Sequence, residues 1–482
     1  MIHAFQLFEN NIVYDANADS LHVFSDTAAE ILSAADKIAA AKSIDPAEIF
    51  TSASLGADST DRDPDFENIF RDIVFMRGAS ESIDAYNEIR DLINEGQLYA
   101  PDEAEPDIAS LEATYVFKSL CMHLAHDCNM RCAYCFASGG EFGMKRELMS
   151  FETARAAIDF ITAASPGRTN IEIDFFGGEP LLNFDVMKRV IDYAKESGRI
   201  SGKNFRFTLT TNALLLDGYK IDYINNNIDN LVLSIDGRRT VHDAARARID
   251  GSGTYGEVVA NISSAICNRE ASWYVRGTYT AKNLDFANDV LHLADMGFNR
   301  VSIEPVVSPP VPELAFAPRD AAVIAAEYER LAWALYDRDV HGKPIDFFHF
   351  NIDIEGGPCP ARRIKGCGAG YEYAAVTPDG GIYPCHQFAG AERFRLGDVF
   401  NGVQSDSVTG QFKKSSLYSK SECRACWAKF LCGGGCAANA WLYNGDINKP
   451  NDFYCAILRK RMECALWLKC ARHISPAPAS KT

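Results

Sequence analysis

The strongest constraint on the fold is a regular alternation of short apolar segments and helical patterns between residues 117 and 305. Strands are expected at 117–123, 171–176, 205–210, 231–235, 274–280 and 300–305, and helices at about 151–164, 184–198, 217–227, 255–268 and 285–296. Strands that alternate with helices form a parallel sheet with right-handed crossovers. The pattern therefore predicts an α/β fold, either a doubly wound sheet or an open, partial (β/α)6 TIM barrel.

Polar residues follow the ends of these predicted strands. In both architectures ligands bind beyond the carboxyl ends of the strands. We therefore expect the polar residues to meet at one mouth of the domain. The residues concerned are Cys128, Gly177, Gly178, Glu179, Pro180, Thr211, Asn212, Ser234, Asp236, Arg276 and Glu304.

Cys128, Cys132 and Cys135 lie in the segment His-Asp-Cys-Asn-Met-Arg-Cys-Ala-Tyr-Cys-Phe, residues 126–136. Three thiolates on one loop can hold three irons of a 4Fe–4S cluster and leave the fourth iron open, whereas a structural zinc site needs four ligands. This spacing, followed by the aromatic Phe136, resembles the signature of the radical S-adenosylmethionine (SAM) enzymes, in which the open iron binds SAM. Three free thiols or part of a zinc site are the alternative interpretation.

The same resemblance implies contacts to SAM. Glu179, in a Gly-Gly-Glu-Pro turn, is expected to hold the methionyl amine, and Arg276 the carboxylate. Asn212 and Ser234 are candidates for the ribose and carboxylate ends, and Tyr134 for packing on the cluster or the adenine. The alternatives are a plain strand-end turn for the Gly-Gly-Glu-Pro segment, a helix cap for Asn212 and a core position for Tyr134.

Eight of the fifteen cysteines lie between residues 359 and 455. Seven of them, from Cys367 to Cys455, would fill one four-ligand zinc site and leave three over, so iron–sulfur ligation explains the number better. The arrangement resembles the SPASM domain of radical SAM peptide-modifying enzymes, which carries two auxiliary 4Fe–4S clusters. The resemblance implies one cluster held by Cys423, Cys426, Cys432 and Cys455, and another held by Cys367, Cys385 and Cys436.

The second of these clusters has only three cysteines in the motif. Either Cys359 supplies the fourth thiolate, or one iron stays open and can bind a substrate cysteine.

His386 follows Cys385 directly, at the place where sulfatase-maturating enzymes carry an aspartate base. We take His386 as the candidate catalytic base, with a structural histidine as the alternative. The remaining thiols are expected to be buried apolar groups: Cys121, Cys267, Cys464 and Cys470.

The first hundred residues are expected to form a small winged-helix-like module. Such a module resembles an element that captures the leader of a precursor peptide as an added strand on its sheet edge. A structural cap or a dimerisation wing is the alternative. The expected elements are strands at 2–8, 11–15 and 20–24, a helix N-capped by Asp26, and helices at about 65–75 and 79–95.

Charge and hydropathy limit where the protein works. A net charge of −17 without a basic stripe argues against a nucleic-acid partner. No signal peptide and no apolar run of membrane-spanning length is present, so a reducing, cytoplasmic setting is expected. The expected domains are a module at 1–100, a linker at 101–114 and a radical SAM barrel at 115–318. A connecting region at 319–358 begins with a helix at 319–340. A SPASM domain at 359–474 ends with a helix at about 455–472, and a disordered tail follows at 475–482.

Nearly the whole chain resembles the SCIFF radical SAM maturases, which act on six-cysteine ribosomal peptides. Besides residues 126–136, the segments that carry this resemblance are 174–181, 205–212, 366–373, 383–388 and 432–440. The resemblance implies an oxidoreductase with SAM and three 4Fe–4S clusters that joins cysteine sulfur to an acceptor carbon, commonly of threonine, as a sactipeptide-type thioether. It also implies a bound leader peptide and a reducing donor of flavodoxin or ferredoxin type. The alternatives are another radical SAM product, such as a formylglycine-type oxidation or a carbon–carbon cross-link, and a non-enzymatic zinc or electron-transfer scaffold.

Overall fold

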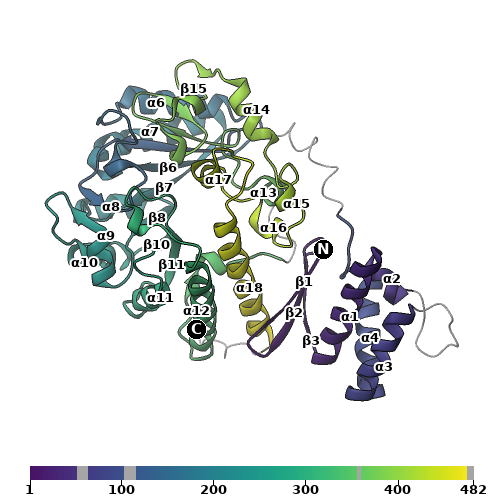
Figure 1. The fold of residues 1–482 in the computed structure, drawn as a ribbon. Helices are drawn as coiled ribbons and strands as arrows, with labels where there is room; N and C mark the ends of the chain where they lie inside the picture. Colours follow the sequence, from purple (N-terminus) through teal and green to yellow (C-terminus); the bar gives the residue numbers. More distant parts are fainter. Residues whose placement is uncertain (52–62, 103–115, 355–359, 475–482) are drawn as a thin grey trace.

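The computed structural model of the chain describes residues 1–51, 63–102, 116–354 and 360–474. A barrel-like α/β domain occupies one side, and a small helical module with a three-stranded sheet lies on the other (Figure 1). Helix α18 (Asp452–Ile474) runs between them. Most of the predicted linker at 101–114, Cys359 and the predicted tail at 475–482 lie outside the described residues.

The α/β domain contains six neighbouring parallel strands, which confirms the predicted fold class. Its strands are β4 (Ser119–Ala125), β6 (Asn170–Gly177), β7 (Asn204–Thr211), β8 (Asn230–Ser234), β10 (Ser272–Tyr279) and β11 (Arg300–Pro305). The helices between them are α6 (Phe151–Ala163), α7 (Phe184–Ser201), α8 (Gly218–Asn227), α10 (Tyr255–Ile266) and α11 (Phe286–Asp295).

The two faces of this sheet differ in polarity. In β6, Ile171, Ile173 and Phe175 are fully buried, and the alternate positions carry Glu172 and Asp174. A doubly wound sheet buries both faces under helices and its strands are continuously apolar. Here the helices cover the outer face (Figure 1) and the inner face is polar, so the sheet is a partial barrel.

The sheet continues into the cysteine-rich C-terminal region. The sequence did not predict this continuation. Strand β13 (Tyr373–Val376) pairs in parallel with β4, at the edge where the barrel would otherwise end. Further short strands extend both edges to a total of eleven. They are β14 (Gly381–Tyr383), β15 (Gly397–Asp398), β16 (Gly402–Val403) and, at the far edge, β12 (Asp346–Phe347).

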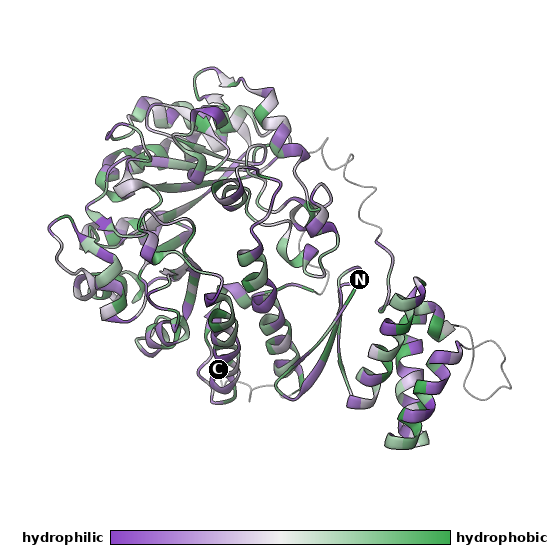
Figure 2. Cartoon of the chain, in the orientation of Figure 1, coloured by the Kyte–Doolittle hydropathy of each residue, from purple (hydrophilic) through white to green (hydrophobic). Residues whose placement is uncertain are grey.

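In its described residues the N-terminal module is an antiparallel sheet followed by four helices, along which hydrophobic and hydrophilic residues are interspersed (Figure 2). Its core is rich in aromatic residues, with Phe50, Phe66 and Tyr86 buried together. The elements are β1 (Ile2–Leu7), β2 (Asn10–Asp15), β3 (Ser20–Phe24), α1 (Asp26–Lys42), α2 (Pro46–Thr51), α3 (Pro64–Arg77) and α4 (Ala79–Asn94).

One prediction about this module is wrong. The N-cap of α1 is Ser25, whose hydroxyl accepts a hydrogen bond from the backbone N–H of Ala28 at 3.1 Å. Asp26 is already the first helical residue, and its carboxylate accepts from the Asn11 side chain. An N-cap needs the extended backbone that Ser25 has, which explains the one-residue difference.

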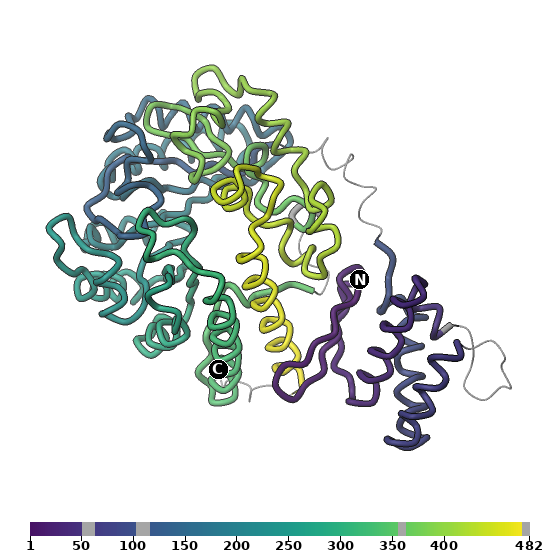
Figure 3. Tube along the Cα trace, viewed as in Figure 1, coloured from purple at the N-terminus to yellow at the C-terminus, as the bar shows by residue number. Residues whose placement is uncertain are grey.

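The N-terminal hairpin lies beside the last helix, α18 (Figure 3). The Trp467 indole donates to the Asn10 side chain at 3.0 Å, and His3 pairs with Glu463 at 2.9 Å. The His3 ring also stacks on Trp427, with ring centroids 3.9 Å apart. Contacts of this kind join the N-terminal module to the cysteine-rich region.

Short elements complete the described chain. Helix α12 (Asp320–Val340) lies where it was expected, and no described helix has the length and apolar character needed to cross a membrane. The other elements are β5 (Met130–Cys132), α9 (Arg239–Ala245), β9 (Arg246–Arg248), α13 (Pro360–Lys365), α14 (Asp406–Lys414), α15 (Ser421–Arg424), α16 (Lys429–Cys432) and α17 (Ala437–Asn444).

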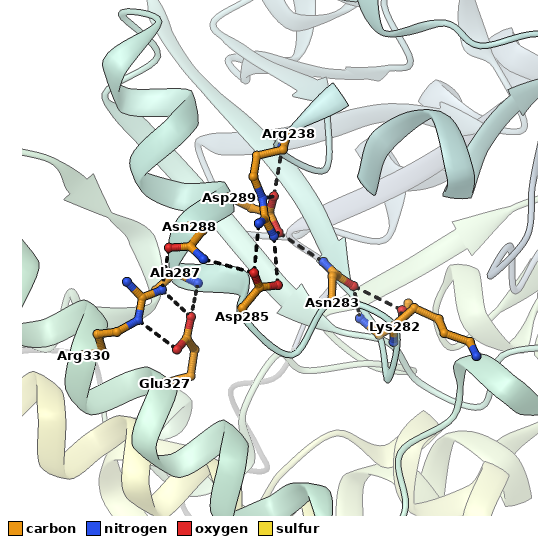
Figure 4. Close-up of polar contacts among 10 residues, drawn as sticks. Arg238, Lys282, Asn283, Asp285, Ala287, Asn288, Asp289, Glu327 and Arg330 are labelled. Carbon is orange, nitrogen blue, oxygen red and sulfur yellow. Dashed lines mark hydrogen bonds and ion pairs between the residues drawn. The ribbon is translucent and has the colours of Figure 1, made fainter. Parts of the chain in front are cut away.

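A polar network holds the loop after β8 against α11 (Figure 4). Arg238 donates to the carboxylate of Asp289 at 2.8 Å and to that of Asp285 at 2.8 Å. Asp289 is fully buried and also accepts from Asn283. A Cβ on Gly237 would lie 2.2 Å from the Cβ of Asp289, so only glycine allows this approach.

Replacing Asp289 with alanine is expected to lower the free energy of unfolding by about 3 kcal/mol, because Arg238 loses its buried partner. The matched change, Asp285→Ala, removes a half-exposed partner and is expected to cost less than about 1 kcal/mol. Urea unfolding of both variants measures the difference. Equal losses would contradict the importance of the buried contact.

Candidate active site

A cavity of about 230 Å³ opens at the carboxyl ends of the parallel strands. It brings together most of the residues predicted from separate motifs. Those that line it are Cys128, Cys132, Tyr134, Cys135, Phe136, Gly177, Gly178, Asn212, Ser234, Arg276 and His386. Most of the residues that follow the strand ends thus share one cavity in this chain.

The cysteine loop is held by backbone contacts. Strand β5 ends at Cys132, which pairs with Arg246 of β9. The backbone N–H groups of Gly178 and Glu179 donate to the carbonyl oxygens of Ala125 and Asp127 at 2.8 and 2.9 Å. A Cβ on Gly178 would lie 2.1 Å from the Asp127 oxygen, so glycine is required here. The Gly-Gly-Glu-Pro turn therefore supports the loop that carries Cys128.

Three residues expected at this mouth lie outside the cavity lining: Glu179, Pro180 and Asp236. The Glu179 carboxylate is fully buried and accepts from the Thr211 hydroxyl and the backbone N–H of Asn212, both at 2.8 Å. Burial raises the pKa of Glu179 to about 7, although these donors oppose the shift. In this structure its side chain fixes the neighbouring strand end, from which Asn212 reaches the cavity.

Two cations face the cavity. Arg276 donates to Glu304 at 2.6 Å. Burial alone would raise the pKa of Glu304, but the charges of Arg276 and His349 outweigh burial and bring it to about 2. Glu304 is therefore ionised at neutral pH and balances the charge of Arg276. The second cation, Arg246, lies nearer the cysteine loop and pairs with Asp236 at 2.9 Å.

The sequence placed Asp236 near the mouth but did not indicate its ion pair with Arg246, a residue that the sequence analysis missed. Asp236 is fully buried and accepts from the Tyr134 hydroxyl at 2.7 Å, from Arg246 Nε at 2.9 Å and from the Thr278 backbone N–H at 3.0 Å. Tyr134 and Arg246 both line the cavity. The Asp-Gly step after β8 was a visible signal for Asp236, but the three-residue strand β9 gave none for Arg246.

His386 lies between the cavity and the cysteine-rich region. Its Nδ1 lies 3.1 Å from the Tyr373 hydroxyl, and its ring contacts Phe136 and Phe176. Burial lowers the pKa of His386 to about 4, so the imidazole is neutral at pH 7. The position and the neutral state are both compatible with the predicted base and with the structural alternative.

The predicted ligands fall into three sets of mutually close thiols. Burial raises the pKa of Cys128 to about 12, and Cys132 and Cys135 act on it as neighbours. Burial likewise raises the pKa of Cys385, with Cys436 and Cys367 as neighbours. Cys423 has a pKa raised to about 12 by burial, with neighbours Cys432, Cys455 and Cys426. These sets are the ones that the resemblance assigned to the three clusters.

Buried thiols of this kind are suited to soft metal centres, because bound iron keeps them deprotonated. Among the described residues, no three His, Cys, Asp or Glu side chains are arranged to hold a single metal ion. A 4Fe–4S cluster distributes its ligands over several irons, and it remains the prediction for each set. Cys359, the candidate fourth ligand of the Cys367 set, is outside the described residues.

The prediction for the remaining cysteines holds for three of four. Cys121, Cys464 and Cys470 are buried. Cys267 is exposed, and the prediction of a buried position is wrong for it. Cys267 directly follows the last residue of α10, where the helix no longer faces the core.

Acid should destabilise the packing of helix α9 through its buried residue His242. This residue is fully buried, its Nε2 lies 2.9 Å from the Thr254 hydroxyl, and burial lowers its pKa from 6.5 to about 4. The unfolded chain binds this proton more readily than the folded chain. The contribution of neutral His242 to the free energy of unfolding is therefore fully present above pH 6.5 and is lost as the pH falls towards 4.

Between pH 7 and pH 5 the His242 contribution is expected to fall by about 2 kcal/mol. The variant His242→Gln should lose that much less stability than the wild-type protein over the same interval. Urea unfolding of both proteins at the two pH values provides the measurement. Parallel losses in the two proteins would show that His242 is not responsible.

Comparison with known proteins agrees with this geometry. Residues 122–266 match the radical SAM superfamily. The chain is 25% identical over 356 residues to the cysteine-type anaerobic sulfatase-maturating enzyme of Clostridium novyi (strain NT), covering 69% of this chain and 91% of that protein. It is 21% identical over 449 residues to the radical SAM cyclopropyl synthase TigE of Paramaledivibacter caminithermalis, covering 82% of this chain and 89% of that protein.

A solved structure shares the fold. Native anSMEcpe with bound AdoMet and Kp18Cys peptide superposes with a TM-score of 0.62 and 19% identity, covering 74% of this chain and 99% of that chain. The superfamily match begins within β4 and ends with α10, so it includes the cysteine loop and much of the cavity.

Proposed function

We propose that this chain, a radical SAM family protein with homology to peptide and sulfatase maturases, forms thioether cross-links in a six-cysteine precursor peptide. Its family implies a 4Fe–4S cluster and SAM. The finer assignment, to a SCIFF-type maturase with two further clusters, rests on the motifs of the sequence.

One observation carries the proposal. The cavity that contains the Cys128 loop is also lined by His386 and Gln387, which directly follow Cys385. The proposed SAM site and one predicted auxiliary cluster would therefore face a common space. A peptide in that space can present an acceptor carbon to one centre and a cysteine sulfur to the other, as intramolecular thioether formation requires.

When bound, the cluster and SAM would supply a 5′-deoxyadenosyl radical that removes hydrogen from an unactivated carbon. The protein would hold the cluster with Cys128, Cys132 and Cys135, and its turn at Gly177, Gly178, Glu179 and Pro180 would support that loop. Asn212, Ser234 and Arg276 line the cavity and are the proposed SAM contacts, and Tyr134 and Phe136 shield the same wall.

His386 is the proposed acceptor for the proton of the substrate thiol. Its Nδ1 contacts the Tyr373 hydroxyl, which leaves Nε2 for the substrate. The auxiliary site held by Cys367, Cys385 and Cys436 would bind the substrate sulfur if its fourth iron is open. If Cys359 instead binds the fourth iron, this cluster has no open iron, and the substrate sulfur would not bind to it.

The N-terminal module is the proposed binding site for the leader of the peptide. Its sheet has the order β1-β2-β3, so β1 and β3 are its two edges. An extended peptide can add to such an edge through backbone hydrogen bonds. The reducing electrons would come from a donor of flavodoxin or ferredoxin type.

Anaerobic co-expression with a six-cysteine peptide tests the proposal. The reconstituted protein should contain about twelve irons per chain, and the peptide should lose two hydrogen atoms per bond and resist thiol alkylation at the bridged sulfur. A product with the same mass loss and all thiols free would instead support another radical SAM reaction. A colourless protein containing zinc but no iron would support a non-enzymatic scaffold.

A further inference from the structure

The cysteine-rich region contains two buried lysines with different surroundings. Lys429 is 2% exposed, and its ammonium pairs with the Asp102 carboxylate at 2.7 Å. Lys420 is 5% exposed, and its ammonium donates to the carbonyl oxygen of Gly434 at 2.7 Å. In the described part of the chain no carboxylate pairs with Lys420. A buried cation without a counter-charge is costly, so its retention calls for an anionic partner.

The position of Lys420 indicates what that partner is. Gly434 lies midway between Cys432 and Cys436 in a turn of three glycines that all have positive φ. The backbone carbonyl of Lys420 accepts from the backbone N–H of Cys423 at 3.1 Å. Lys420 therefore connects the start of α15 to the turn whose two cysteines belong to different predicted clusters.

Thiols of both sets act on this ammonium. Burial lowers the pKa of Lys420, and negative charge on the sulfurs of Cys423, Cys432, Cys436 and Cys455 opposes the shift. Cys436 belongs to the set with Cys367 and Cys385, and the other three belong to the second set. Lys420 therefore lies where sulfurs of both predicted metal centres act on its charge, beside the glycine turn that its ammonium contacts.

We propose that Lys420 is the common counter-charge of the two auxiliary clusters and raises the reduction potential of both. The inference rests on the proposed function, because it requires both cysteine sets to hold iron–sulfur clusters. Each reduction adds one electron and one negative charge to a cluster, and no bond forms or breaks. A fixed cation in a low-dielectric interior favours the more negative, reduced form.

A shared cation also links the two potentials. Removing the charge should shift both clusters in the same direction, so their difference changes little. Lys420 acts on the clusters through its charge and not through contact with the peptide.

The test is a potentiometric titration of the anaerobically reconstituted full-length protein, followed by electron paramagnetic resonance, with SAM added to distinguish its own cluster. In Lys420→Gln, which keeps a donor for Gly434, the ratio of reduced to oxidised auxiliary cluster at a fixed potential should fall about tenfold for both clusters, equivalent to about 59 mV. Lys420→Arg keeps the charge and should change this ratio less than about twofold. Lys429→Gln, whose charge is already balanced by Asp102, should change it less than about threefold.

Each other outcome is decisive. An unchanged ratio in Lys420→Gln, a shift in only one cluster, or an equal shift in Lys429→Gln would overturn the inference. Loss of a cluster in both Lys420→Gln and Lys420→Arg would also overturn the inference, because a structural role of the lysine would explain that result. Loss of a cluster in Lys420→Gln alone would support it, because only that variant lacks the charge. The iron content and signals of the wild-type protein test the proposed function separately, because they report whether two auxiliary clusters exist at all.

Discussion

Replacing Cys128, Cys132 and Cys135 together with alanine is expected to abolish SAM cleavage and to lower the iron content from about twelve to about eight atoms per chain. The three thiols line the cavity and are predicted to hold only the SAM-binding cluster. The auxiliary sets lie in the C-terminal third, so their clusters should remain. Release of 5′-deoxyadenosine under reducing conditions and iron analysis are the two measurements.

A matched cysteine change separates this effect from a general loss of thiols. Cys267 is exposed and belongs to none of the three sets. The variant Cys267→Ala should retain full iron content and full SAM cleavage. Residual cleavage in the triple variant at more than a few per cent of the wild-type rate would show that SAM is bound and cleaved elsewhere.

Replacing Asp236 with alanine is expected to lower the free energy of unfolding by about 4 kcal/mol and to abolish detectable SAM binding. Asp236 is fully buried and balances the charge of Arg246, which is 11% exposed at its side chain. Without the carboxylate, this cation beside the cysteine loop has lost its partner, and Tyr134 and Thr278 lose their acceptor. Urea unfolding and a SAM-induced change in the cluster spectrum measure the two effects.

The control for this change is Tyr134→Phe. It removes one hydrogen bond to Asp236 and leaves the contact between Asp236 and Arg246 intact. A loss of about 1 to 2 kcal/mol is expected, with SAM binding retained at reduced affinity. If the tyrosine variant were as unstable as Asp236→Ala, the balance of charge would not be the main contribution of Asp236.

The sequence predicted the barrel strands where side chains alternate. Strands β6 and β7 match the expected ranges to within one residue at each end, because apolar and polar positions alternate along them. Strand β4 is shifted by two residues from the expectation of 117–123. All seven of its residues are buried, so no alternation marks its ends.

Other features depend on contacts between distant segments, which periodicity does not report. Tyr373 of β13 pairs with Ser119 of β4, and the three-residue strand β9 places Arg246 beside Cys132. Motif spacing could place the cysteine loop and the strand-end residues at one mouth. It could not show that Glu179 turns its carboxylate away from the cavity, since that depends on the donors from Thr211 and Asn212.

The pairing of β13 with β4 has a consequence for engineering. The cysteine-rich region is not an independent unit that can be exchanged between enzymes, because one of its strands completes the hydrogen bonding of the first barrel strand. A chimaera joined in the connecting region before Tyr373 would expose the backbone of β4 or pair it with a foreign strand. Successful transplants should therefore carry the donor's β4 together with its β13.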